Sequence, residues 1–303
     1  MNMTLSVIIC TYNRGRYLPM ILDSLRFQAL SSELFEIIMV NNKSTDNTEE
    51  IISNYIKEFP DIPLKYFMES SQGISYARNR GIQESRGDII VFLDDDETID
   101  PDFLEGVLDF FTNHPDAGIT AGPVIPVYED VKPAWLTPFI SRAITGEYNK
   151  GDHIKLLKGK DYPGTGHACF RKELFYKYGI FNPDLGRKGN SVLGAEDKDF
   201  FLRLIKGGEK CYYLPIAKIY HHLPAEKMSV DFFVKIAYGI GKSERIRTYS
   251  SHKKAYLYRF CVEIFKWFAS VALWITYFVT GRLKKGNKII LFRYYITKGL
   301  ICC

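Results

Sequence analysis

Short apolar runs and amphipathic stretches alternate along the first half of the chain. The apolar runs are rich in β-branched residues and predict buried strands over 5–10, 35–42, 64–68 and 88–93. Stretches with apolar residues at helical spacing follow them and predict helices over 18–25, 46–59, 74–85 and 100–111. A further strand is expected near 117–127. Strands that alternate with helices in this way predict a mostly parallel sheet covered by helices on both faces.

Two of these helices carry a local start signal. Asp46 together with Glu49 predicts a capping box at the start of the second helix. Asp100 followed by Pro101 predicts an N-cap and a first helical residue for the fourth.

The periodicity is weaker after about residue 130. Residues 129–165 combine Pro, Gly and Trp with little regular spacing, and we expect an irregular loop region that is mobile or covers the binding site. Beyond it, the pattern predicts helices over 172–178, 197–206 and 228–248, and a strand pair over 210–222.

The segment 260–280 is strongly apolar, although Glu263 and Lys266 interrupt it. Basic residues follow directly at Arg282, Lys284 and Lys285. This pattern favours an interfacial or re-entrant membrane anchor. A full span starting near Tyr258 and a buried helical hairpin are the alternatives.

Composition adds a charge asymmetry to this picture. The 303 residues are 46% apolar and 25% charged, as in an ordinary globular protein, and the net charge is a modest +5. The acidic motifs come before about residue 200, whereas the last part of the chain is basic and aromatic. This favours contact with a membrane surface or an anionic substrate, and we expect no nucleic-acid partner.

The cysteines and the N-terminal residues indicate the cellular compartment of the protein. The six cysteines match neither a disulfide framework nor a zinc pattern. The first ten residues lack the basic and then apolar regions of a signal peptide. We therefore expect a cytoplasmic protein associated with the inner face of the cell membrane.

Polar side chains follow three of the predicted strands: Thr11-Tyr12-Asn13, Asn41-Asn42 and Asp94-Asp95-Asp96. In parallel sheets, ligands bind at the carboxyl ends of the strands. We therefore expect these clusters to form one binding site.

The three consecutive aspartates are costly unless a positive group binds them. Alternate residues at a strand end point the same way, so Asp94 and Asp96 would face a divalent cation and its attached phosphates. Asp95 would point away from this pair or toward the remaining part of the ligand. These oxygen ligands suit Mg²⁺ or Mn²⁺. The alternative is a solvated turn that caps the next helix.

Three other positions are candidates, each with a simpler alternative. Asp197 lies at a predicted helix start, which favours an ionised carboxylate; it is a general base or only an N-cap. His221 or His222 contacts a metal or a phosphate, or both are ordinary strand-end residues. Arg78, near a helix start, binds pyrophosphate or is a surface charge.

Six stretches, in order over residues 4–225, resemble the family 2 glycosyltransferases, which are inverting enzymes with the GT-A fold: SVIICTYNRGRYLPMILDSL, IIMVNNKSTDNT, GISYARNRGI, GDIIVFLDDDE, GTGHACFRKELFYKYGIF and GAEDKDFFLRLIKGG. The resemblance implies that Thr11 and Asn41 hold the base and ribose of a nucleotide. It also implies that Asp94 and Asp96 form a DxD pair, with Asp96 as the direct metal ligand, and that Asp197 is the general base.

One residue departs from the family pattern. The family usually has an aspartate where this chain has Asn41, and that acid accepts a hydrogen bond from the uracil ring. Asn41 can accept through its amide oxygen, but it is uncharged and can also donate. A UDP-sugar is the first expectation, and other nucleotides stay open.

The function expected from the resemblance is metal-dependent transfer of a sugar, in polysaccharide or glycoconjugate biosynthesis, to a saccharide or lipid-linked saccharide acceptor. We expect a GT-A domain over 1–225, with a nucleotide-binding half (1–128) and an acceptor half (129–225), and a basic, aromatic helical extension over 226–303. The alternatives are a non-catalytic nucleotide- or carbohydrate-binding protein and a sugar-phosphate nucleotidyltransferase.

Overall fold

The computed structural model describes residues 3–159, 161–189, 193–251 and 253–302. The chain forms two compact units. Unit 1 comprises Met1–Pro126, Tyr148–Pro183 and Glu196–His222, and unit 2 comprises Val127–Glu147, Asp184–Ala195 and Leu223–Cys303. The domain boundaries expected at 128 and 225 stay a prediction.

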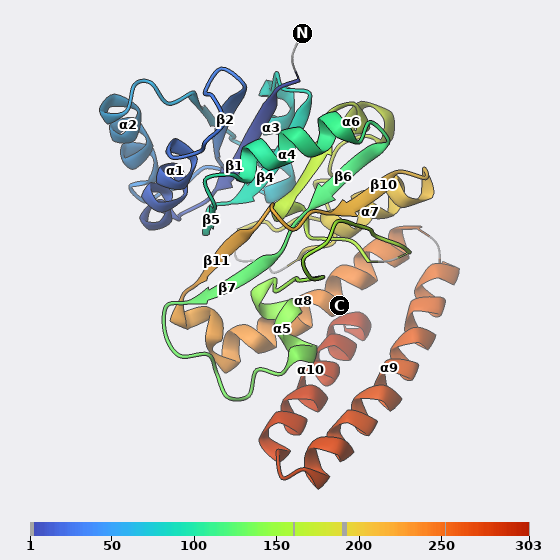
Figure 1. The fold of residues 1–303 in the computed structure, drawn as a ribbon. Helices are drawn as coiled ribbons and strands as arrows, with labels where there is room; N and C mark the ends of the chain where they lie inside the picture. The colour runs from blue at the N-terminus through green and yellow to red at the C-terminus, as the bar shows by residue number, and fades with distance from the viewer. Residues whose placement is uncertain (1–2, 160, 190–192, 252, 303) are drawn as a thin grey trace. The chain divides into compact units, whose positions relative to one another are not determined.

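Two sheets organise the strands (Figure 1). The large sheet has eight strands in the order β3-β2-β1-β4-β9-β6-β10-β8, and the small sheet has the order β5-β11-β7. The strands are β1 (Leu5–Thr11), β2 (Phe35–Asn41), β3 (Leu64–Met68), β4 (Ile89–Asp94), β5 (Glu97–Ile99), β6 (Ala117–Ala121), β7 (Val124–Tyr128), β8 (Lys155–Leu156), β9 (Ala168–Arg171), β10 (Lys210–Tyr213) and β11 (Ile219–Leu223).

The neighbouring strands β3, β2, β1 and β4 are parallel, as the alternating pattern predicts. Their register aligns Thr11 of β1 with Asn41 of β2, and Cys10 of β1 with Asp94 of β4. The carboxyl ends of these strands therefore meet at one edge of the sheet. Beyond β4, the antiparallel strand β9 makes the sheet mixed.

Six helices belong to unit 1: α1 (Leu18–Arg26), α2 (Thr48–Glu58), α3 (Ile74–Glu84), α4 (Phe103–Asn113), α6 (Glu173–Tyr178) and α7 (Glu196–Lys206). Val7 and Ile9 of β1 point into the core shared with α1, α2 and α4. Ile8 points into the other core, with α3, α6 and α7. Successive strand residues point to opposite faces, so an apolar run such as β1 supplies both cores.

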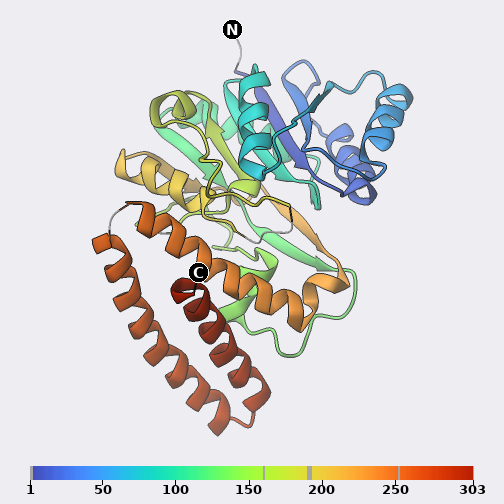
Figure 2. The ribbon, with the colours of Figure 1, turned by 180° about the vertical axis from the view of Figure 1, so that it is seen from behind.

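Unit 2 contains α5 (Pro138–Thr145), α8 (Val230–Ser251), α9 (Lys253–Val279) and α10 (Leu283–Ile301), of which the last three are drawn in orange to red in Figures 1 and 2. Its core joins α5, α8 and α10. A Cβ at Gly241 of α8 would lie 1.9 Å from the carbonyl oxygen of Ile296, and one at Gly299 of α10 would lie 2.1 Å from that of Tyr238. The two glycines therefore let α8 and α10 pack backbone against backbone.

Three short elements complete the chain: the 3-10 helices η1 (Gly15–Tyr17), η2 (Thr165–His167) and η3 (Ala225–Met228). The irregular region expected over 129–165 is partly wrong, because it contains α5. The two strands expected over 210–222 are present as β10 and β11, but they do not pair with each other, because they belong to different sheets.

The capping-box prediction is wrong as well. Helix α2 has Asn47 at its N-cap, and the Asn47 side chain makes no capping hydrogen bond. Asp46 instead accepts hydrogen bonds from the backbone N–H groups of Thr48 at 3.1 Å and Gly15 at 3.2 Å. It therefore connects the start of α2 to η1. The start predicted for the fourth helix is also wrong, because α4 begins at Phe103 with Asp102 at the N-cap, and not at Pro101.

Candidate functional site

The acidic run lies at the carboxyl end of β4. Asp94 is the last residue of that strand, and Asp95 and Asp96 form the turn into β5. The side chain of Asp94 is 48% exposed, whereas that of Asp96 is 4% exposed. The expected two-residue alternation does not apply here because the strand ends at Asp94, and the orientation of each carboxylate follows from its own contacts.

Arg14 lies beside the two buried aspartates. Its Nη2 atom is 3.2 Å from Oδ2 of Asp96, and its Nε atom is 3.9 Å from Oδ1 of Asp95. Burial is the main cause that raises the pKa of the Asp95 carboxyl to about 7. The positive charge of Arg14 lowers this pKa, and the negative charge of Asp96 raises it. Arg14 thus faces two buried carboxyl groups of this turn.

The structure distinguishes the two histidines. Strand β11 pairs antiparallel with β5, which aligns His221 with Glu97. The Nε2 atom of His221 lies 3.5 Å from Oδ1 of Asp96. His222 instead has its Nε2 atom 3.0 Å from the hydroxyl of Thr98. His221 is therefore the histidine beside the acidic turn.

Arg78 is buried on α3 and contacts three carboxylates. Its Nη1 atom donates to Oδ1 of Asp197 at 2.7 Å and to Oε1 of Glu196 at 3.2 Å. Its Nη2 atom lies 3.7 Å from Oδ1 of Asp94. The surface-charge alternative for Arg78 is wrong, since the residue is 5% exposed. Arg80, on the same helix, pairs with Glu84 at the surface.

Asp197 lies in the first turn of α7, which begins at Glu196, so it is not the N-cap. Its Oδ1 atom accepts from Arg78, and its Oδ2 atom accepts from the backbone N–H of Thr165 at 3.3 Å. Burial raises the pKa of this carboxyl, but Arg78 and Thr165 outweigh burial and hold the pKa below its ordinary value. Asp197 is therefore ionised at neutral pH and fixed on both oxygens.

The segment 164–167 joins these groups, and sequence reasoning gave it no role of its own. The Nε2 atom of His167 accepts from the backbone N–H of Gly164 at 3.0 Å, so the ring proton is on Nδ1. That atom lies 3.8 Å from Oε1 of Glu97, and Oε2 of Glu97 accepts from the backbone N–H of Asp94 at 2.9 Å. His167 and Glu97 therefore connect the segment that contacts Asp197 to the acidic turn.

Gly166 lies directly beside Asp94. A Cβ at this position would lie 2.4–2.5 Å from the carboxylate atoms of Asp94. The sequence signals for this arrangement are a glutamate directly after the three aspartates and a histidine after Gly-Thr-Gly. Neither signal indicates by itself that the two segments meet.

The other two polar strand ends form one turn. Asn13 has a left-handed backbone with φ of 53°, and its Oδ1 atom accepts from the backbone N–H of Thr45 at 2.7 Å. Asn41 accepts from the N–H of Ser44 at 2.9 Å through Oδ1 and donates to the hydroxyl of Tyr66 at 3.0 Å. These side chains therefore shape the loop after β2.

Thr11 and Tyr12 lie at the end of β1. This strand is between β2, which leads into the loop, and β4, which leads into the acidic turn. Thr11 is buried at the end of β1, and Tyr12, the next residue, is half-buried. The register aligns β1 with both β2 and β4. The expected clusters after β1, β2 and β4 thus lie on three adjacent strands.

The acidic turn fits an open site for a divalent cation. Within the described residues, no group of three or more His, Cys, Asp or Glu side chains is arranged to hold a metal ion. Asp96 and His221 supply an oxygen and a nitrogen donor 3.5 Å apart. Mg²⁺ and similar ions are often bound by one or two protein ligands together with substrate phosphates, so a closed protein cage is not required.

Comparison with known proteins gives a consistent picture. The family model "Glycosyl transferase family 2" matches residues 6–179. A glucosyl-dolichyl phosphate glucuronosyltransferase of Haloferax volcanii is 27% identical over 84% of this chain and 82% of its own length. The succinoglycan biosynthesis protein ExoM of Rhizobium meliloti is 26% identical over 78% of this chain and 72% of its own.

Solved structures share the fold. The mannosyltransferase PcManGT from Pyrobaculum calidifontis has a TM-score of 0.65 at 17% identity, covering 99% of this chain and 88% of that one. The S. aureus protein TarS has a TM-score of 0.56 at 20% identity, covering 78% of this chain and 65% of the TarS fragment. These likenesses confirm the predicted GT-A-like arrangement of a mixed sheet flanked by helices.

Proposed function

Because this chain belongs to glycosyl transferase family 2, we propose that it transfers a sugar from a nucleotide-sugar donor to a saccharide or lipid-linked saccharide, with inversion at the anomeric carbon. The observation that carries this proposal is the contact of Arg78 with both Asp197 and Asp94. It joins an ionised carboxylate, suited to a general base, to an acidic turn suited to a metal-bound diphosphate.

The donor's nucleotide binds at the ends of β1 and β2 in this proposal, through Thr11, Tyr12, Asn13 and Asn41. A UDP-sugar is the first choice, and TarS has been solved in complex with UDP-GlcNAc. Asn41 offers an amide and not a carboxylate to the base, so the preference for uracil rests on one neutral acceptor.

A divalent cation, Mn²⁺ or Mg²⁺, belongs to this proposal. Asp96 and His221 would hold it together with the donor's phosphates, with Asp94 as a further candidate ligand, and when bound it supplies positive charge that stabilises the departing diphosphate. PcManGT was solved with GDP-Man and Mn²⁺. Arg14 pairs with Asp96 and Asp95 and balances part of their charge.

Asp197 acts as the general base. An acceptor hydroxyl is a weak nucleophile at neutral pH, and its proton passes to a carboxylate oxygen of Asp197 as the hydroxyl oxygen attacks the anomeric carbon. Attack on the face opposite the nucleoside diphosphate inverts that carbon in one displacement. Arg78 and the N–H of Thr165 keep the carboxylate ionised and oriented before the acceptor binds.

We assign the acceptor to the cytoplasmic face of the membrane. The relatives in Haloferax volcanii and Methanococcus voltae are named as enzymes of dolichyl-linked saccharides. Among the described residues, α9 is the one helix long and apolar enough to cross a membrane by length and composition. In this proposal, residues 1–128 bind the nucleotide, 129–225 bind the acceptor and 226–303 associate with the membrane.

The proposal is tested by incubating the full-length protein with a panel of nucleotide sugars, Mn²⁺ or Mg²⁺ and a lipid-linked acceptor, and identifying the released product. Nucleoside diphosphate and a product of inverted anomeric configuration are expected. Pyrophosphate would indicate nucleotidyl transfer, and no turnover with any donor would favour a binding protein. Asp96→Ala should abolish the Mn²⁺-dependent part of nucleotide affinity, and unchanged affinity would contradict the metal assignment.

A further inference from the structure

The longest helix of unit 2 has its polar and apolar faces reversed relative to a helix of a soluble protein. Glu263 and Ser270 of α9 are 1% and 0% exposed, whereas Phe265 and Phe268 on the opposite face are 73% and 70% exposed. The exposed face runs the length of the helix and carries these large side chains: Leu257, Tyr258, Ile264, Phe265, Phe268, Val271, Ile275, Phe278 and Val279.

The inward face of α9 is fixed by a buried ionic cluster. Glu263 accepts from Arg259 at 2.7 Å and from Arg293 of α10 at 2.9 Å. Arg259 also donates to Glu244 of α8 at 3.0 Å, and Arg293 to Ser270 at 3.2 Å. Charged side chains that face the inside of a helical group while apolar ones face outward are the arrangement of lipid-exposed helices.

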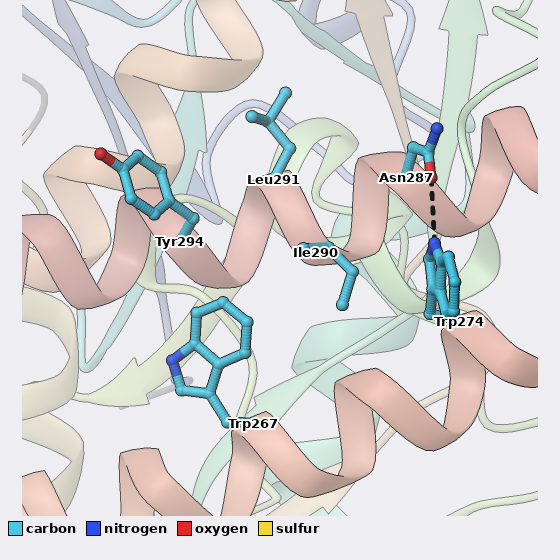
Figure 3. Close-up of a pocket in the computed structure, with 6 residues that line it drawn as sticks. All are labelled: Trp267, Trp274, Asn287, Ile290, Leu291 and Tyr294. Atoms are coloured by element: carbon cyan, nitrogen blue, oxygen red, sulfur yellow. Dashed lines mark hydrogen bonds between the residues drawn. The ribbon is translucent and has the colours of Figure 1, made fainter.

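A groove of about 420 Å³ runs between α9 and α10 (Figure 3). Its lining residues are Trp267, Trp274, Asn287, Ile290, Leu291 and Tyr294. Ile290 of α10 points toward the two indole rings of α9 (Figure 3). The indole N–H of Trp274 donates to Asn287, and that of Trp267 donates to Thr297, each at 2.9 Å. With both N–H groups bonded inside the hairpin, the groove offers mainly carbon to an occupant.

Basic residues of the α9–α10 hairpin indicate the kind of membrane surface that it would bind. The turn between the two helices and the first residues of α10 carry Arg282 and Lys284, which are exposed, and Lys285, which is half-buried. These cations complement anionic lipid headgroups. They also oppose a crossing, because the turn would have to carry three charges through the hydrocarbon layer.

We propose that the α9–α10 hairpin lies flat in the interface of a bilayer containing anionic phospholipid. The exposed face of α9 lies among the acyl chains, and one lipid chain occupies the groove between the helices. This inference deepens the membrane association in the proposed function. The experiments that test it measure lipid binding alone. Their outcome therefore does not depend on whether the protein transfers a sugar.

Binding is tested by flotation of the full-length protein with vesicles of phosphatidylcholine, alone or mixed with phosphatidylglycerol. The wild type should float with the mixed vesicles. Replacing Arg282, Lys284 and Lys285 by Gln should lower the partition coefficient about fivefold per residue. Phe265→Ser with Phe268→Ser should abolish flotation, while Phe27→Ser, which removes a phenyl ring 61% exposed on unit 1, should leave it unchanged. A wild type that stays soluble, or a double variant that floats normally, would overturn the proposal.

Orientation is tested by tryptophan fluorescence. The chain has three tryptophans, so Trp135→Phe leaves only the two that line the groove. Phospholipids brominated on the acyl chain should quench this emission, most strongly when the bromine is near the headgroup. Ile290→Phe, which narrows the groove without adding an indole, should weaken quenching of this pair. Strongest quenching by bromine at the chain end would indicate a deep or spanning helix and contradict the flat orientation, and no quenching would contradict the lipid groove.

Discussion

Arg78 donates to Asp197 at 2.7 Å, although the two residues are 119 positions apart in the chain. The same guanidinium lies 3.7 Å from Asp94, at the end of a central strand of the sheet. A helix that was expected to bind pyrophosphate therefore supplies a contact between the acidic turn and the candidate base.

Removing the charge of Arg78 should change the pH dependence of transfer. Because Arg78 holds the pKa of Asp197 below its ordinary value, Arg78→Gln should raise that pKa and move the acid limb of kcat to higher pH. Arg78→Lys keeps a positive charge and should retain part of the shift. The pH profile of kcat measures this. Arg80→Gln, on the exposed side of the same helix, is the control, and an identical limb in Arg78→Gln would contradict the role.

We expect His167 to keep Asp197 in position and not to bind the donor. His167→Ala frees the segment 164–167 from Glu97, so the N–H of Thr165 no longer aligns the carboxylate of Asp197. We expect kcat to fall about 10- to 100-fold, since small misplacements of a reacting group have effects of this size. Steady-state kinetics measures this fall in kcat separately from the KM for the donor, which should change little. His153→Ala, at an exposed position, is the control; an equal loss in both variants would argue against a specific role.

Many residues of this site could be predicted from local patterns in the sequence. The contacts between distant segments could not. The runs that became β1, β2 and β4 are buried on both faces, so their apolar residues and polar ends are visible in the sequence. The pairing of Glu97 with His167 depends on how β9 inserts antiparallel between β4 and β6. Nothing in the spacing of these residues indicates that insertion. The orientation of α9 was open for a similar reason, because Glu263 finds its partner Arg293 on another helix.

Gly166 should tolerate no side chain. In Gly166→Ala the new methyl carbon would lie within 2.5 Å of the Asp94 carboxylate, which must leave its present position. Donor KM should rise about 10-fold or more, with no loss of folding, as measured by kinetics and thermal unfolding. Gly194→Ala, where a Cβ meets open space, is the matched control. A Gly166→Ala variant with the wild-type donor KM would show that Asp94 does not need its present position.

Asn41 should set the preference among nucleotides. Asn41→Asp keeps an acceptor for the N–H of Ser44 and adds the negative charge that the family usually has at this position. If the donor carries uracil, UDP should bind more tightly to the variant, with little change for GDP. Calorimetric titration of both nucleotides in the presence of Mn²⁺ measures the difference. Weaker UDP binding in the variant would indicate that a different base is the natural ligand.

The assignment of Asp197 as the general base is tested most directly by the turnover of Asp197→Asn with saturating donor and acceptor. The account predicts that kcat falls about 10²- to 10⁴-fold while donor affinity stays at the wild-type value, because the amide cannot take the acceptor's proton. Asp199→Asn, in the same first turn of α7, removes an acidic residue that pairs with Arg203 and should retain full turnover. Wild-type turnover in Asp197→Asn would contradict the account.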